Sequence, residues 1–146
     1  MYRELLNELI QNHDWAKLQE PCPEKEIKKA EKHVGYPFPE ELKALLRETN
    51  GDRWLLLSAK EIMENVERNR SILGECFDDA EEFSERVGRY IFFATNGCGD
   101  YYCYQILPDG KADTTAIYMW EHEMFDCLIV AKDIRDLICK YYNDEV

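Results

Sequence analysis

Carboxylates and one imidazole gather in the segment MWEHEMFD, residues 119–126. They are Glu121, His122, Glu123 and Asp126. Such side chains bind divalent metals when they converge, but strand alternation sends Glu121 and Glu123 to one face and His122 to the other. A helical zinc motif would need two histidines four residues apart, and only one is present. We therefore interpret these acids as solvent-exposed groups at a strand end.

A second segment, NGCGDYYCY at residues 96–104, places two glycines and an acid before a tyrosine-rich run. A phosphate-binding loop needs glycines that open a helix, whereas these glycines open a strand. A hairpin turn with positive φ at Gly97 and Gly99 is the favoured interpretation. No GxSxG, GK[ST] or GxGxxG motif occurs, and no cysteine has an obvious histidine partner. We predict no catalytic residue, cofactor or metal.

Amphipathic helices fill the first third of the chain, because apolar residues recur there at helical spacing. The segments are residues 2–10, 23–35 and 38–51. Gly35 and Gly51 provide left-handed exits from the second and third helices. The apolar run RWLLL, residues 53–57, predicts a short strand, and Ser58 with Glu61 has the spacing of a capping box that begins another helix.

From Tyr90 onward the composition is typical of strands, in the segments YIFFAT, DYYCYQI and TTAIYMW. The first two strands, joined by the five residues 96–100, must be antiparallel neighbours. A closing helix in KDIRDLICKYY has Asp133 as its N-cap. Its expected inward residues are Ile134, Leu137, Ile138 and Tyr141. The predicted fold is one α+β domain over residues 1–146, with N-terminal helices, an antiparallel β-meander sheet and a C-terminal helix packed on the sheet.

Charge narrows the class of partner. The 146 residues include 18 basic and 30 acidic side chains, giving a net charge of −12 that would repel nucleic acids and anionic membranes. A basic protein would be attracted to this negative charge.

Six scattered cysteines without a CxxC pair predict reduced thiols. With no secretory signal and no membrane-spanning apolar run, we expect a cytoplasmic protein.

Acids are densest in ECFDDAEEFSE, residues 75–85, which holds six carboxylates and no positive charge. This stretch is either a solvated face or a patch for a cationic partner. Several aromatic residues fall on the predicted strands, where some line the core and the others would give an outward surface typical of protein interfaces.

Several segments, in order and over nearly the whole chain, resemble the SUKH superfamily of Smi/Knr-type domains. They are VGYPFPEELKALLRETNG (34–51), FFATNGCGDYYCYQI (92–106), AIYMWEHE (116–123) and IVAKDIRDLI (129–138). The acidic stretch is a departure from the family pattern. The resemblance implies a non-enzymatic domain, and it implies for bacterial members a cytosolic immunity protein that neutralises a toxin domain, often a nuclease. The lack of a long extension favours the bacterial type over the larger fungal proteins.

The combined hypothesis is an immunity protein that covers a basic toxin domain sterically and electrostatically, with its oligomeric state left open. Candidate contact residues are Asp100, Tyr101, Trp120, Glu121, Glu123, Asp78, Asp79, Glu81 and Glu82. Two other functions stay open, a general protein-interaction scaffold and a small metal-dependent hydrolase. The hydrolase would use Asp100, Glu121, His122 and Glu123.

Overall fold

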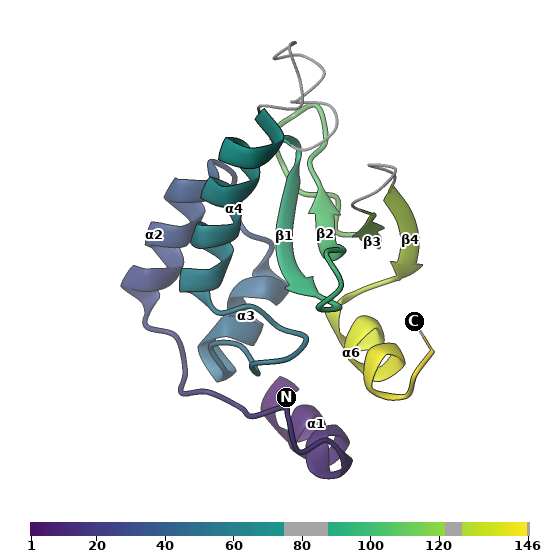
Figure 1. Cartoon of the computed structure of the whole chain (residues 1–146). Helices are drawn as coiled ribbons and strands as arrows, with labels where there is room; N and C mark the ends of the chain where they lie inside the picture. Colours follow the sequence, from purple (N-terminus) through teal and green to yellow (C-terminus); the bar gives the residue numbers. More distant parts are fainter. Residues whose placement is uncertain (75–87, 122–126, 146) are drawn as a thin grey trace.

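Helices come first, a four-stranded antiparallel sheet follows, and a helix closes the chain (Figure 1), which confirms the predicted α+β fold. The computed structural model describes residues 1–74, 88–121 and 127–145. The helical elements are α1 (Tyr2–Leu9), the 3-10 turn η1 (Ile10–Asn12), α2 (Glu24–Val34), α3 (Glu40–Glu48), α4 (Ala59–Gly74) and α6 (Ile134–Tyr142). The strands are β1 (Tyr90–Thr95), β2 (Tyr101–Gln105), β3 (Ile117–Trp120) and β4 (Cys127–Ala131).

The sheet is a meander in the order β1-β2-β3-β4, with every neighbouring pair antiparallel. The turn between β1 and β2 is the predicted hairpin, and Gly97 and Gly99 have φ of +79° and +97°. Strand β4 was not predicted from the sequence. Its apolar residues do not alternate with polar ones, and Leu128 and Ile129 are exposed.

The run at residues 53–57 is not a strand, contrary to the sequence prediction. It makes a single isolated bridge, between Leu56 and Ala94 of β1. The Leu57 N–H donates to the Phe93 carbonyl at 3.0 Å and the Leu55 carbonyl accepts the Thr95 N–H at 2.9 Å, so pairing with β1 is limited to residues 55–57. The Leu56 N–H lies between these two bonds and donates to the Asp52 carboxylate at 2.8 Å instead. The chain then enters α4 through the predicted capping box, in which Ser58 and Glu61 each accept the other's backbone N–H.

The predicted apolar stripes of the helices are confirmed. They are Ile27, Ala30 and Val34 of α2 and Leu42, Leu45 and Leu46 of α3, all buried. In α6, Asp133 accepts the Asp136 N–H at 2.8 Å as the predicted N-cap. The inward tyrosine of α6 is Tyr142 and not Tyr141, which is only partly buried.

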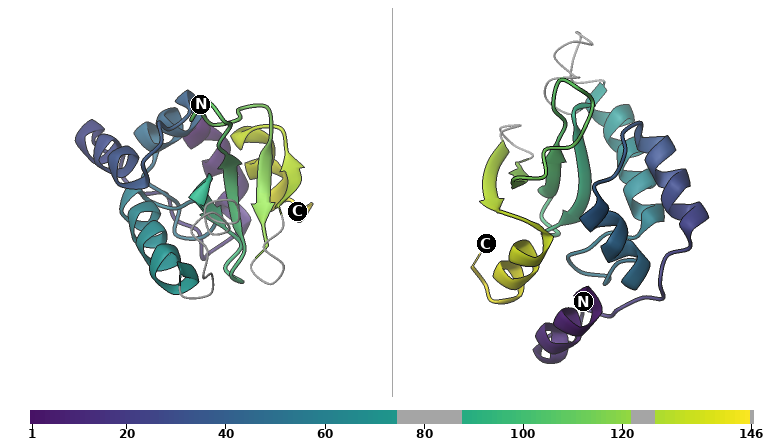
Figure 2. Two further views of the ribbon diagram at one scale, coloured as in Figure 1. Left: turned by 90° about the horizontal axis from the view of Figure 1, so that it is seen from above. Right: turned by 180° about the vertical axis from the view of Figure 1, so that it is seen from behind.

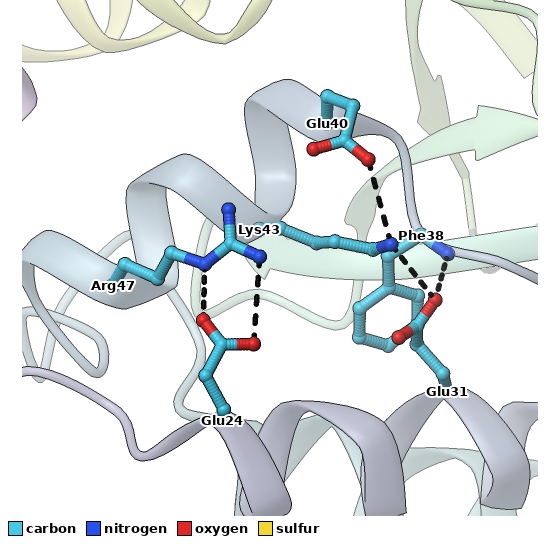
Figure 3. A network of polar contacts seen from close by, with 6 residues as sticks. All are labelled: Glu24, Glu31, Phe38, Glu40, Lys43 and Arg47. Carbon is cyan, nitrogen blue, oxygen red and sulfur yellow. Dashed lines mark hydrogen bonds and ion pairs between the residues drawn. The ribbon is translucent and has the colours of Figure 1, made fainter.

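Polar contacts fix the connection between α2 and α3 (Figure 3). Glu31 of α2 accepts the Phe38 N–H at 2.9 Å, and its carboxylate lies 3.6 Å from the Lys43 ammonium of α3. Glu24 and Arg47 form a second, exposed bridge between the same helices. These contacts join α3 to α2.

Apolar side chains form clusters on both faces of the sheet. The larger cluster joins the helices to the sheet and includes Tyr102 and Tyr104 of β2. The smaller one contains Phe92, Cys103 and Trp120. Successive β2 side chains therefore enter different clusters, as strand alternation requires, and neither face of β2 is open.

Helices α2 and α4 lie side by side, whereas α1 and α6 lie together at the end of the molecule that holds both chain termini (Figures 1 and 2). This arrangement brings residues that follow η1 near the last turn of α6. Within the described residues, no helix has the length and hydropathy to cross a membrane.

Candidate partner-binding surface

The β1–β2 turn is held by its own side chains. The Asn96 amide donates to the Asp100 carboxylate at 3.1 Å, and the Thr95 hydroxyl donates to the Asp100 carbonyl at 2.9 Å. The Cys98 N–H donates to the Asn96 side-chain oxygen at 2.9 Å. These bonds satisfy the polar groups of a five-residue turn, so it presents a fixed shape.

An open cleft of about 280 Å³ separates this turn from α4. Its lining residues are Leu57, Glu61, Glu64, Asn65, Arg68, Thr95, Gly97, Gly99 and Tyr101. The Tyr101 hydroxyl donates to the Asn65 side-chain oxygen at 3.1 Å across the cleft. Asn65 is a buried polar residue, with 7% exposure, so this bond both satisfies its amide oxygen and fixes the tyrosine ring.

The cleft wall contains two acids, Glu61 and Glu64, and one base, Arg68. The Glu64 carboxylate also lies 3.9 Å from the exposed Lys60 ammonium. Carboxylates beside a tyrosine ring can bind a basic side chain through charge, hydrogen bonds and cation–π contact. Sequence reasoning did not assign a binding role to Glu64, Asn65 or Arg68. Their spacing along α4 is that of one helix face, which is the signal that could have grouped them.

Candidate residues from the two strands come together at one end of the sheet. Tyr101 and Trp120 are direct cross-strand partners, with ring centroids 6.4 Å apart. Asp100 precedes Tyr101 and Glu121 follows Trp120, so all four belong to one neighbourhood.

Trp120 differs from the other candidates because its side chain is only 2% exposed. Its ring packs edge-on against Phe92 at 5.5 Å, inside the smaller apolar cluster. Its place in the structure is therefore beneath the surface, supporting Tyr101. The remaining candidates, Asp78, Asp79, Glu81, Glu82 and Glu123, lie outside the described residues.

No three His, Cys, Asp or Glu side chains in the described ranges lie close enough to hold a metal. Of the metal site considered from the sequence, Asp100 and Glu121 are described, whereas His122 and Glu123 lie outside these ranges. The cysteines in the described part of the chain are all free thiols.

Two carboxyl–tyrosine pairs inside the protein have shifted pKa values. Burial raises the pKa of Glu41, whose carboxylate accepts a hydrogen bond from the Tyr104 hydroxyl at 2.5 Å. Burial likewise raises the pKa of Asp52, although the bond from the Tyr142 hydroxyl opposes the shift. Glu41, Asp52 and Tyr104 do not line the described cleft, and we interpret both pairs as structural.

The model of the SMI1 / KNR4 family (SUKH-1) matches residues 21–140 of the chain. The match begins just before α2 and extends into α6, so it includes the cleft, the β1–β2 turn and the whole sheet. No curated protein matches the sequence.

Proposed function

Because the chain belongs to the SMI1 / KNR4 family (SUKH-1), we propose that it is an immunity protein that binds and neutralises a cognate toxin domain. The family is generally non-enzymatic, and its members bind protein toxins, which supports a protein partner in place of a substrate. The proposed toxin is a basic, nuclease-type domain held in a cytoplasmic complex.

The observation that carries this proposal is the fixed, acid-lined cleft beside the β1–β2 turn. Tyr101 is oriented there by Asn65, and Glu61 and Glu64 supply negative charge along the same wall. A nuclease needs a basic surface to hold phosphates, so an acidic protein seated on that surface would block its substrate path.

Net charge adds a kinetic contribution. A protein at −12 would attract a basic domain over distances of about a Debye length, on the order of 10 Å at 0.1 M salt. Such steering can raise association rate constants to about 10⁸–10⁹ M⁻¹s⁻¹ at low salt. The acids Asp78, Asp79, Glu81 and Glu82 are the proposed source of this local field.

The primary test is rescue of growth. A toxin domain encoded beside this gene is expressed in a bacterial host with and without this protein, and a pull-down checks that the two chains associate. We expect the host that makes the toxin domain to grow only when it also makes this protein. Association without protection, or protection without association, would reject neutralisation by binding.

Steering is tested separately by stopped-flow association at low and high salt. The Asp78→Lys/Asp79→Lys variant should associate more slowly than wild type. The matched control, Glu4→Lys/Glu8→Lys on exposed positions of α1, makes the same change in net charge and should have a smaller effect. An association rate that salt does not change would disprove steering, even if protection is real.

The cleft is tested by Glu64→Arg, which reverses a charge in its wall without touching the Tyr101–Asn65 bond. We expect faster dissociation of the complex. Glu4→Arg, the same charge reversal at an exposed position of α1 outside this cleft, is the reference for a general effect of altered charge. Unchanged dissociation of the Glu64→Arg variant would show that the partner binds elsewhere.

A further inference from the structure

A second, aromatic pocket of about 190 Å³ lies where three distant segments meet. The segments are the residues after η1, the turn that precedes α4, and the last turn of α6 with the residues after it. The lining residues are His13, Trp15, Trp54, Tyr141, Tyr142 and Asp144. None of them belongs to the acidic cleft at the β1–β2 turn.

The indole rings of Trp15 and Trp54 face solvent together. Their centroids lie 5.2 Å apart at an interplanar angle of 52°, and their exposed fractions are 50% and 44%. The His13 ring packs edge-on against Trp15, with centroids 4.9 Å apart, and is tilted against Tyr142 at 5.3 Å. A pair of adjacent, half-exposed tryptophans is a feature of binding hot spots, because large rigid rings give contact area at low entropic cost.

The pocket is held rigidly from beneath. The buried Asp52 carboxylate accepts a hydrogen bond from the backbone N–H of Trp54 at 2.9 Å and another from the Tyr142 hydroxyl. Arg53, which stands between Asp52 and Trp54 in the sequence, has φ of +63°, a left-handed conformation that costs a non-glycine residue roughly 1–2 kcal/mol. The indole of Trp54, which follows this turn, lies beside that of Trp15.

Charge at the pocket favours a cation. Asp144 is the acid in its lining and is exposed. The neighbouring Arg53 instead lines a separate cavity, with Glu20 and Glu61. Aromatic faces attract cations located within about 6 Å of the ring centroid, and a guanidinium also stacks flat on an indole.

We propose that this aromatic pocket receives an arginine side chain of a protein partner. Because the two indole rings stand at 52° to each other, the guanidinium stacks on the face of one and contacts the other, while the Asp144 carboxylate accepts its N–H groups. The inference deepens the proposed function, because a basic toxin domain would supply such an arginine. Its test uses an amino-acid derivative and no partner, so its failure is distinguishable from failure of the proposed function.

The probe is Nα-acetyl-arginine amide, titrated into the full chain while the indole N–H signals are followed by NMR. The three tryptophans give an internal comparison, because Trp120 is buried in the smaller apolar cluster. We expect the indole N–H signals of Trp15 and Trp54 to shift with added arginine derivative until the shift saturates. The Trp120 signal should keep its position. The citrulline derivative has nearly the same shape without the charge, and it should bind more weakly.

Variants locate the site. Trp54→Leu should weaken binding of the arginine derivative by about 2–5-fold, which corresponds to one exposed cation–π contact. Asp144→Asn should weaken it by about 2–5-fold, and less so at high salt. Asparagine also tolerates the left-handed φ of +57° at position 144. The control Asp109→Asn makes the same charge change in the exposed turn after β2 and should bind as wild type.

Several results would overturn the proposal. They are equal binding of the citrulline and arginine derivatives, equal shifts at Trp120, and no saturable shift at all. Stronger binding of an acetylated proline dipeptide would assign the pocket to a proline-rich segment instead.

Discussion

The hydroxyl of Tyr142 donates a hydrogen bond to the carboxylate of Asp52, a residue 90 positions earlier in the chain. Asp52 is fully buried, and it also accepts the backbone N–H groups of Trp54 and Leu56. One side chain thus joins α6 to the turn that leads into α4. Burial, followed by the charge of Asp52, raises the pKa of Tyr142, so this hydroxyl remains a donor.

Removing that donor should destabilise the protein. Tyr142→Phe leaves the Asp52 carboxylate without one of its hydrogen bonds, and we expect a loss of about 1.5–3 kcal/mol in the free energy of unfolding, measured in urea. Tyr118→Phe removes a longer, only part-buried bond, 3.4 Å, to the Asp113 carboxylate and should cost less. Equal losses from the two variants would contradict a special role for the buried bond.

The titration of Asp52 should appear in the pH dependence of stability. Burial raises its pKa above the ordinary value of 3.8, so the folded protein holds this proton more tightly than the unfolded chain does. The stability that the protonated form supplies is fully present below pH 3.8 and is lost as pH rises through the raised pKa.

The comparison variant is Asp52→Asn, which cannot ionise. Urea unfolding of both proteins at several pH values gives the difference, wild type minus variant. We expect this difference to fall as pH rises through the window above 3.8. A rising difference would mean that the three hydrogen-bond donors outweigh burial and lower the pKa instead.

Two glycines with similar backbone angles should respond differently to alanine. Gly51 has φ of +87°, and an added Cβ would lie 2.9 Å from the Ser58 nitrogen and 3.0 Å from the Leu56 oxygen. Gly97 has φ of +79°, with no atom within 4 Å of such a Cβ. Gly97→Ala should cost about 1–2 kcal/mol of left-handed strain.

Gly51→Ala adds a backbone collision to that strain, so we expect about 1–3 kcal/mol of further loss. Thermal unfolding of the two variants provides the comparison. If both lose the same stability, the segment that precedes α4 can move away from the new methyl group.

The N-cap of α6 gives another expected loss. Asp133→Ala removes the acceptor for the Asp136 N–H and should cost about 0.5–2 kcal/mol. Asp133→Asn keeps an acceptor oxygen and should lose only a small part of this. A large loss in both variants would assign the effect to the negative charge at the helix N-terminus and not to the hydrogen bond.

Much of the fold could be predicted because its signals are local. Helical spacing identified the stripes of α2 and α3, and the Ser58–Glu61 box located the start of α4. The segment at residues 53–57 has the composition of a strand, but only residues 55–57 pair with β1 before Ser58 begins the cap of α4, which leaves one isolated bridge. Strand β4 was missed because it shows no alternation and leaves Ile129 exposed.

Candidate binding residues were harder to predict, since alternation assigns a face but not what covers it. Trp120 was predicted as a candidate contact residue, but its side chain is buried in the smaller apolar cluster. The aromatic pocket gave no sequence signal, because Trp15, Trp54 and Tyr141 belong to segments that only the tertiary fold brings together.

Cys98 sits in the β1–β2 turn, and among the cysteines in the described ranges it is the exposed one. Burial raises the pKa of the Cys22 thiol to about 11 and raises the pKa of the Cys103 thiol well above its ordinary value, so both resist alkylation. A maleimide dye would therefore react at Cys98 in preference to these buried thiols, beside the acidic cleft. Its emission would report the arrival of a partner there in real time, without an engineered attachment point.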